Sequence, residues 1–335
     1  MRTLLIFTIV TSTAFSAMAA IHILDNSASA MPSAYTTAQG ANDSALVGDT
    51  IFVIGSGIYY GTLNTTKTLK WFGPGFYLSS NPETQANNGA ARFPVINVNA
   101  GSQGSLFTGL QVESGIYVNT GNILIRRCLA FINGSGTFAI SVTSGVSNVT
   151  IEQCYIYSTA SQYIVGLNSS HSVTIQNCFL QNIANSGYAA IISNIDGGPY
   201  TILNNVLIGG INVNNALINN NIMVAGYFTP NNSGYNNNIA NSTQFGSTNG
   251  NQINVTMNNT MFIQGVSPDG SYKLASGSVA HNAGVGGVDC GMFGGPYPYV
   301  LSGVPNLPTI TYLSAPSSGS TVNGLPVTFR ARGRD

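Results

Sequence analysis

The middle of the chain alternates apolar and polar residues in short blocks that recur along the sequence. The clearest blocks are residues 123–130, 149–156 and 173–180, followed by 200–207 and 216–223. Equivalent positions in successive blocks are 26, 24, 27 and 16 residues apart. A period of two is typical of a half-buried strand. Each block therefore predicts a strand, a bend rich in Asn and Gly, and a second short strand.

A repeat of this length cannot bury its own apolar face, but a stack of repeats forms one continuous core. Stacking in register places like residues on like, at the roughly 4.8 Å spacing of paired strands. The column Cys128, Cys154, Cys178 would continue as Asn205 and Asn221, with side chains hydrogen-bonded along the stack. The predicted fold class is all-β: a right-handed parallel β-helix (solenoid) with a short N-terminal capping helix and a small C-terminal β extension.

Two other all-β architectures fit the recurrence less well. A β-sandwich does not explain why similar residues return at one coil length. Propeller blades repeat at roughly 40 residues or more, which is longer than the steps seen here. Weaker copies of the repeat follow near Asn238 and Thr260, which lengthens the predicted stack.

The two ends of the chain differ from the repeat. Arg2, a short apolar run and the small-x-small pattern Ala17-Met18-Ala19 are typical of a secretory signal, and a membrane anchor is the alternative. The mature chain is expected to begin at Ala20 or Ile21, with no transmembrane segment after cleavage. The expected organisation is a signal peptide at 1–19, an N-terminal cap at 20–47, the parallel β-helix at 48–300, and a C-terminal linker and β-hairpin at 301–335.

The amino-acid composition limits which classes of binding partner are expected. Only 6% of residues are charged, and ten cations balance ten anions, so no basic surface for nucleic acid is expected. Apolar residues make up 44% of the chain, which argues against disorder. The four cysteines are expected to be buried free thiols, because stacked positions are farther apart than a disulfide prefers.

Several stretches outside the repeat carry a family resemblance. Residues 33–46 resemble a short capping helix, and Gly48-Asp49-Thr50-Ile51-Phe52-Val53 resembles the start of a first coil. Residues 70–78 and 81–87 continue the likeness, and residues 280–284 and 287–295 resemble a closing motif. With them the chain resembles the secreted pectin-lyase-like β-helix superfamily, and more closely a group of uncharacterised exported bacterial β-helix repeat proteins. The likeness covers about residues 33–300. It implies the fold and export, but the superfamily includes lyases, polygalacturonases, adhesins and tailspikes, so it does not choose a function.

Catalytic chemistry has few candidates. Hydrolases of this fold need paired carboxylates, and no two carboxylates are adjacent in this sequence. Arg126 and Arg127 are the cations of the central stack, and Arg126 aligns one coil above Glu152. This pair is either an exposed ion pair worth about 0–1 kcal/mol or part of a lyase site with an Arg base. No acidic calcium cluster accompanies it, and neither a metal site nor a cofactor is expected.

Two apolar groups are candidate binding surfaces. Tyr59, Tyr60, Trp71 and Tyr77 suit a ligand-binding groove, although core packing beneath the cap explains them equally well. If the inward–outward alternation continues through the bend with Cys178 inward, a second apolar group points outward. This group would form an exposed stripe suited to self-association: Leu129, Tyr155, Phe179, Val206 and Ile222. Two alternatives stay open for the stripe: a shift of parity that places it inside, or coverage by the C-terminal segment.

The function that follows is an expectation from shape and composition. The leading hypothesis is a secreted or cell-surface, non-catalytic β-helix that acts as an extracellular scaffold or fibre component, or as a glycan-binding module. Its partners would be a polysaccharide or other copies of itself. The alternative is a polysaccharide lyase or glycoside hydrolase of the pectin-lyase-like superfamily. Arg330, Arg332 and Arg334 give the last strand a basic face, which suits either a docking tail or a charged edge that resists pairing.

Overall fold

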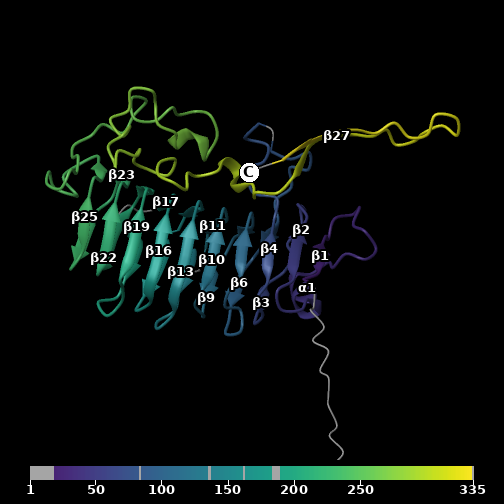
Figure 1. The fold of residues 1–335 in the computed structure, drawn as a ribbon, viewed down its shortest axis with the longest axis horizontal. Coiled ribbons are helices and arrows are strands. Elements are labelled where there is room, and N and C mark those ends of the chain that lie inside the picture. Colours follow the sequence, from purple (N-terminus) through teal and green to yellow (C-terminus); the bar gives the residue numbers. More distant parts are fainter. Residues whose placement is uncertain (1–18, 83, 135–136, 161–162, 183–188, 334–335) are drawn as a thin grey trace, which may run out of the picture.

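The computed structural model describes residues 19–82, 84–134, 137–160, 163–182 and 189–333. In these residues the chain winds as a parallel β-helix, and its successive coils contribute strands to three parallel sheets (Figure 1). We name them the front, upper and lower sheets after their positions in Figure 1. No helix within the described ranges has both the length and the apolar character needed to cross a membrane.

Each sheet takes one strand from successive coils. The front sheet contains β1 (Ile21–Leu24), β2 (Thr50–Val53), β4 (Lys70–Phe72), β7 (Leu106–Thr108), β10 (Ile123–Arg126), β13 (Ser147–Glu152), β16 (His171–Gln176), β19 (Tyr200–Leu203), β22 (Ala216–Asn219) and β25 (Gly234–Asn236). The upper sheet contains β5 (Arg92–Phe93), β8 (Gln111–Val112), β11 (Leu129–Ile132), β14 (Tyr155–Ser158), β17 (Phe179–Asn182), β20 (Val206–Ile208), β23 (Ile222–Ala225) and β26 (Ile239–Ala240). The lower sheet contains β3 (Leu63–Thr65), β6 (Ile96–Val98), β9 (Ile116–Val118), β12 (Ile140–Val142), β15 (Val165–Asn168), β18 (Ala189–Ser193), β21 (Gly210–Asn214) and β24 (Phe228–Asn231).

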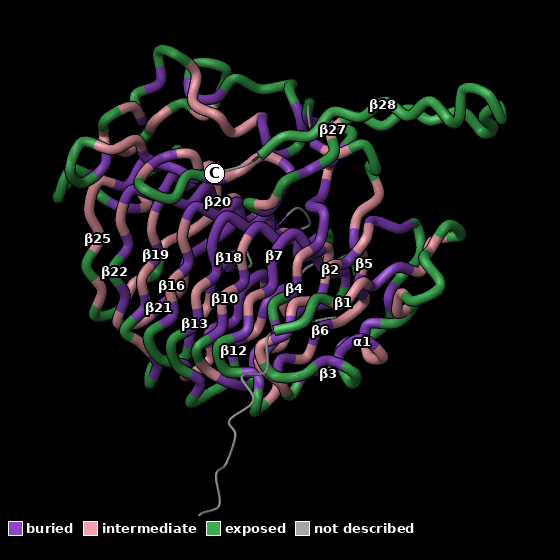
Figure 2. The backbone as a smooth tube through the Cα atoms, turned by 45° about the vertical axis from the view of Figure 1, so that its right-hand side comes forward, coloured by how far each residue is buried: buried purple, intermediate pink, exposed green. Residues whose placement is uncertain are grey.

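The alternation along each strand decides which side chains form the core. Ile151 pairs with Ile125 on one side and with Ile175 on the other, and the column continues through Ile202 and Ile218. All five side chains are fully buried. Stacked β-branched residues suit the pleated interior of a parallel sheet. Ile151 and Ile175 therefore point into the core, and the tube in Figure 2 changes between buried and less buried stretches along the coils.

The bend between the front and upper sheets carries the predicted ladder. The backbone N–H of Cys178 donates to Oδ1 of Asn205 at 2.9 Å, and that of Asn205 donates to Oδ1 of Asn221 at 2.9 Å. The ladder runs further, through Asn238 to Asn251, so the copy expected near Asn238 is present. All four cysteines lie in described residues and are buried free thiols, as predicted. Burial raises the pKa of the Cys128 and Cys178 thiols.

The N-terminal end is closed by α1 (Ala38–Ser44), which is shorter than the expected 33–46. Tyr35 is extended instead, because its N–H donates to Ile23 and its carbonyl accepts from Asp25. Thr37 caps the helix by accepting from the N–H of Gly40. At the other helix end, the Lys67 ammonium donates to three carbonyl groups, those of Asn42, Asp43 and Ala45. The solenoid starts earlier than residue 48, since β1 already belongs to the front sheet.

The C-terminal part folds back over the upper sheet. The last strand of the solenoid is β26, well before residue 300, and residues 241–282 form loops that include η1 (Gly270–Tyr272). Residues 283–306, which we name the strap, then run back along the β-helix and include η2 (Leu301–Gly303) (Figure 1). The chain ends in the predicted hairpin, β27 (Thr309–Ser314) paired antiparallel with β28 (Thr328–Arg332), which projects from the body (Figure 1).

Candidate functional site

Two of the expected ligand-binding aromatics lie in the core. Tyr60 is 1% exposed and Trp71 is 0% exposed, so no ligand in solution reaches either ring. Trp71 points inward because it alternates with Lys70 and Phe72 on β4. Tyr60 turns inward from the loop before β3, and its hydroxyl donates to the carbonyl of Ile54 at 2.7 Å. The prediction of a binding role is therefore wrong for these two residues, and core packing explains them.

Tyr59 points outward and joins a polar network. Its side chain is among the exposed hydrophobic ones at 41%. The guanidinium of Arg92, on β5, lies 4.3 Å from the centre of the Tyr59 ring and donates to the Tyr59 hydroxyl at 2.8 Å. The hydroxyl in turn donates to Glu113, which follows β8. One exposed aromatic face, a cation and a carboxylate thus meet at the start of the upper sheet.

Glu113 is the centre of this network. Its Oε1 accepts from Arg92 Nε at 2.8 Å and from Gln111 Nε2 at 3.0 Å. Burial acts to raise the pKa of Glu113, but the hydrogen bonds from Arg92, Tyr59 and Gln111 outweigh it, so the pKa is lowered. Glu113 in turn raises the pKa of the Tyr59 hydroxyl. The carboxylate is therefore ionised at neutral pH, and the adjacent guanidinium balances its charge.

On the next coils, aromatic rings form a mostly buried cluster. The rings of Phe131 and Tyr157 are parallel, with centres 4.9 Å apart, and Tyr157 packs edge-on against Tyr155. The ring of Tyr77 also packs edge-on against Tyr155, with ring centres 5.5 Å apart. Tyr77 is partly buried and belongs to this aromatic cluster, and none of its ring contacts within the described residues reaches Tyr59.

We name Tyr59, Arg92, Gln111 and Glu113 the Tyr59 site. The sequence identified Tyr59 but not its partners. Register is the signal that could have found them, because Arg92 pairs with Gln111 in adjacent coils of the upper sheet and Glu113 lies two residues beyond Gln111 on the same outer face.

The weak catalytic candidates do not form one site. Arg126 and Glu152 make the expected ion pair across β10 and β13, and Gln176 also donates to Glu152 at 2.7 Å. Arg126 has a side chain 38% exposed and is open to solvent. Arg127 is 7% exposed and donates to the carbonyl of Val304 and to Asn306 in the strap, as well as to Gln153. A polymer outside the solenoid cannot reach Arg127 unless the strap is displaced, so its candidacy as a lyase base is wrong.

The apolar stripe proved to be covered, not exposed. Leu129, Tyr155 and Phe179 do point outward from the solenoid core, as parity predicts, and so do Val206 and Ile222. All five are nonetheless buried, because Met261, Phe262 and Met292 of the C-terminal part pack over them. The ring of Tyr272 lies 4.3 Å from that of Phe179. Exposure of this stripe for self-association is therefore contradicted, and coverage by the C-terminal segment is the alternative that holds.

Side-chain amides beside the stripe hold the strap. Gln153 donates to the carbonyl of Pro298 at 2.7 Å. Asn177 donates to the carbonyls of Met292 and Gly294, at 2.9 and 2.7 Å. Asn204 donates to Asp289 at 2.9 Å, and Asn237 donates to Ala283 at 2.8 Å. One side chain per coil thus bonds the strap backbone, and the strap runs opposite in direction to the growth of the coils.

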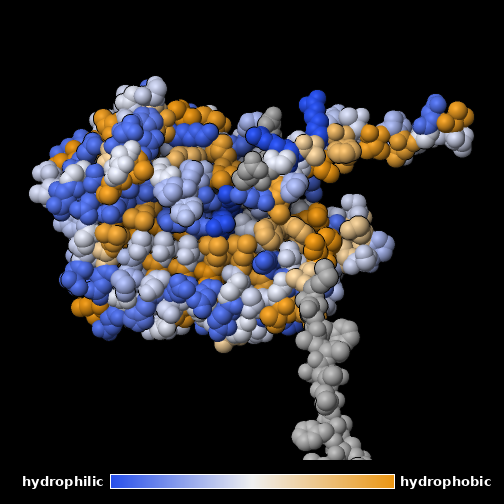
Figure 3. Space-filling model, in the orientation of Figure 1, coloured by the Kyte–Doolittle hydropathy of each residue, from blue (hydrophilic) through white to orange (hydrophobic). Residues whose placement is uncertain are grey.

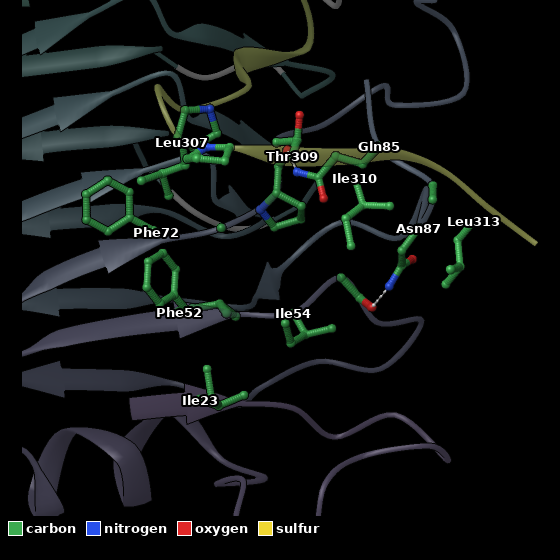
Figure 4. Close-up of a pocket in the computed structure, with 17 residues that line it drawn as sticks. Ile23, Phe52, Ile54, Phe72, Gln85, Asn87, Leu307, Thr309, Ile310 and Leu313 are labelled. Atoms are coloured by element: carbon green, nitrogen blue, oxygen red, sulfur yellow. Dashed lines mark hydrogen bonds between the residues drawn. The ribbon is translucent and has the colours of Figure 1, made fainter. Parts of the chain in front are cut away.

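The base of the hairpin encloses an apolar pocket of about 480 Å³ (Figure 4). Phe52 and Phe72 form one wall with ring centres 5.7 Å apart, Leu307 lies beside Phe72, and Ile310 and Leu313 lie across from the rings (Figure 4). None of the described residues that line the pocket is charged. The N–H of Ala86 donates to the carbonyl of Ile310, so this joint also fixes the start of β27. Hydrophobic surface gathers here and along the hairpin (Figure 3).

Side chains that could bind a metal ion are scattered through the described part of the chain. Among the described residues, no three His, Cys, Asp or Glu side chains come together in a group that could hold a metal ion. His22 and His281 each pair with one aspartate, Asp49 and Asp289 respectively. Comparison with known proteins adds no assignment: no family model matches the chain, and no curated protein is significantly similar to it.

Proposed function

We propose that this protein is an exported, extracellular β-helix that binds glycan at the Tyr59 site and otherwise serves as a scaffold. The observation that carries the proposal is the arrangement of Tyr59, Arg92 and Glu113: a solvent-exposed aromatic ring beside a carboxylate and a guanidinium that are already bonded to each other. Sugar rings stack their C–H faces on aromatic rings, and their hydroxyl groups bond to carboxylate, amide and guanidinium groups. Export is supported by the signal-like sequence of residues 1–19.

The charge of the site favours a neutral polysaccharide. Arg92 is the cation of the site, and its charge is already balanced by Glu113. The carboxylate of a uronate would meet the ionised Glu113 and would be repelled. Neutral hydroxyl groups meet no such repulsion, and they can both donate to Glu113 and accept from Arg92.

Affinity electrophoresis tests this proposal. We expect at least one neutral polymer among a β-glucan, a xylan and a mannan to retard the protein, and polygalacturonate not to. Tyr59→Ala should abolish the retardation. The matched control is Tyr312→Ala, because Tyr312 is 45% exposed and also lies beside an arginine, with Arg330 at 5.3 Å, but has no carboxylate partner among the residues that the structure describes. Retardation by none of the neutral polymers, or equal loss in both variants, would refute the proposal.

The alternative function is a polysaccharide lyase of the pectin-lyase-like superfamily. Its specific support is that Arg126 is solvent-accessible and pairs with Glu152 on the outer face of the front sheet. We expect no unsaturated uronate products from polygalacturonate or alginate at neutral pH, because the Arg126 guanidinium is held in an ion pair by Glu152. Products that form with the parent and disappear in Arg126→Ala would establish the lyase instead.

A further inference from the structure

The first coil begins at a buried carboxylate that faces the backbone nitrogen of Ala20. Asp49 directly precedes β2 and is 2% exposed. Its Oδ1 accepts from the Ala20 nitrogen at 2.7 Å. Its Oδ2 accepts from the N–H of Leu46 at 2.8 Å and lies 2.8 Å from Nε2 of His22. Asp49 therefore ties the residue before β1 to the start of the second strand.

Ala20 is held by the solenoid on both sides of its α-carbon. Its nitrogen donates to Asp49, and its carbonyl accepts from the N–H of Thr50 at 2.9 Å. Ala19 and Ala20 are nevertheless exposed. The peptide bond between them is therefore open to solvent at the point where the β-helix starts. It also directly follows Ala17-Met18-Ala19, the small-x-small pattern of a cleavage site.

Asp49 has no permanent cation beside it. Within the described part of the chain, its ion-pair partner is His22, which is charged only when protonated. A buried carboxylate is costly unless a cation or several donors offset the loss of water. The N–H groups of Ala20 and Leu46 and the ring of His22 meet part of this need. A positive charge at the Ala20 nitrogen would add a permanent cation to this set without any rearrangement.

We propose that proteolytic hydrolysis of the Ala19–Ala20 bond completes this site by creating an ion pair between the new α-ammonium of Ala20 and Asp49. The C–N bond between Ala19 and Ala20 breaks as water adds: the hydroxyl joins the carbonyl carbon of Ala19 and the remaining hydrogen joins the nitrogen of Ala20. The new carboxylic acid of Ala19 then releases a proton, which converts the Ala20 amine into the α-ammonium. The protease is a signal-cleaving peptidase of the export route. A start at Ile21 would lose both bonds of Ala20, so the structure selects Ala20. The inference rests on the export part of the proposed function.

Intact mass and N-terminal sequencing of the exported full-length chain test the cleavage position. We expect a mature protein that begins at Ala20. A start at Ile21 or farther along overturns this inference while leaving export and glycan binding intact. A chain that stays in the cell with residues 1–19 attached overturns export itself, so the two failures are distinguishable.

The pH dependence of thermal unfolding tests the ion pair. An α-ammonium paired with Asp49 has a raised pKa, so its stabilisation is complete below about 8, the usual upper value for an α-amino group, and is lost as pH rises through the raised pKa. We expect the mature parent to lose its stability advantage over Asp49→Asn between about pH 8 and 10. The charged and titratable groups around the site are His22, Tyr35, Asp43, Lys67 and Lys70, and both proteins contain them.

A second measurement serves if Asp49→Asn fails to fold. Isotope-labelled reductive methylation keeps the amine charged, and NMR then follows its titration in the parent protein. We expect an α-amine pKa at least one unit above 8, which corresponds to tenfold tighter proton binding. An α-amine pKa of about 7.7–8.0, as in an unpaired terminus, would overturn the ion pair.

Discussion

One residue at each bend between the front and upper sheets has a left-handed backbone conformation. Arg127, Gln153 and Asn177 have φ of 52°, 54° and 52°, and the next coils place Asn204, Asn220 and Asn237 there. Asn tolerates this conformation better than most residues, which explains its frequency at the bend. The amide and guanidinium groups at these positions also bond the strap. The same side chains therefore fit the bend and fasten the cover.

From the hydrogen bonds of the asparagine ladder, we expect a large loss of stability when one amide side chain is removed. Oδ1 of Asn221 accepts from both the backbone N–H and the Nδ2 of Asn205, and all these groups are fully buried. We expect Asn221→Ala to lower the free energy of unfolding by about 3 kcal/mol, because it leaves buried donors without acceptors. Urea denaturation measures the change. Asn231→Ala, which removes an exposed amide bonded to Asn214, is the control, and an equal loss would contradict the prediction.

The lowered pKa of Glu113 predicts how the stability of the protein changes at acid pH. The pKa of this carboxyl group is lowered in the folded protein, so its stabilisation is present above the unfolded value of about 4.3 and is lost as pH falls through the folded pKa. We expect the stability difference between the parent and Glu113→Gln to be largest near neutral pH and to shrink below about pH 5. Thermal unfolding between pH 3 and 7 checks this. A difference that grows toward low pH would mean that Glu113 is not ionised in the network.

At the scale of the strand, the place of a residue in the alternation of apolar and polar positions decides whether its side chain points inward or outward. Ile175 of β16 lies in the isoleucine column, while its neighbour Thr174 pairs with Thr150 and Thr201 on the outer face. Every inward residue touches the coils before and after it, so a strand cannot shift by one residue without exposing its whole apolar set. The column therefore fixes the register of the front sheet.

This assignment is tested by introducing a charge at an inward position and at an outward position of β16. We expect Ile175→Asp to fail to accumulate as folded protein, because the buried carboxylate would have no partner. Thr174→Asp, one residue away and facing outward, should retain most of the parent yield and protease resistance. Soluble, protease-resistant Ile175→Asp at parental yield would contradict the strand phase.

At the scale of the whole molecule, the strap makes the upper sheet a buried layer. Asp269 is fully buried where the loops meet the strap, and it accepts from Asn81, from the N–H of Ser302 and from the hydroxyl of Tyr299. These bonds join the loop after β4 to the far end of the chain. The cover leaves the Tyr59 site open, because Tyr59 and Arg92 retain solvent exposure.

The amides of the bend should control how firmly the strap is held. In the double variant Gln153→Ala/Asn177→Ala, we expect the backbone amides of residues 289–300 to exchange hydrogen at least tenfold faster, because four bonds to strap carbonyls are lost. Exposure of Tyr155 and Phe179 should then promote self-association, which light scattering detects. Gln176→Ala, an amide on the same coil bonded to Glu152, should change neither measurement. Equal exchange in both variants would show that apolar contacts alone hold the strap.

Local pattern determined much of this protein. The period of two identified the strands, and the recurrence of Cys128, Cys154 and Cys178 established the coil length and the ladder that continues into Asn205. These features could be predicted because each coil contacts its nearest neighbours, which lie one repeat away in the sequence. The same reasoning identified the hairpin and the burial of the thiols.

Tertiary structure decided what covers each face. Parity placed Phe179 outward, but only the strap made it buried, through contacts such as that of Asn177 with Met292, 115 residues away. Tyr59 and Tyr60 are adjacent in sequence, yet one is exposed and the other lies in the core, because they occupy an irregular loop without a fixed alternation. Repeat periodicity carries no information about how a non-repeating segment docks, since its partners are set by shape and hydrogen bonding across distant coils.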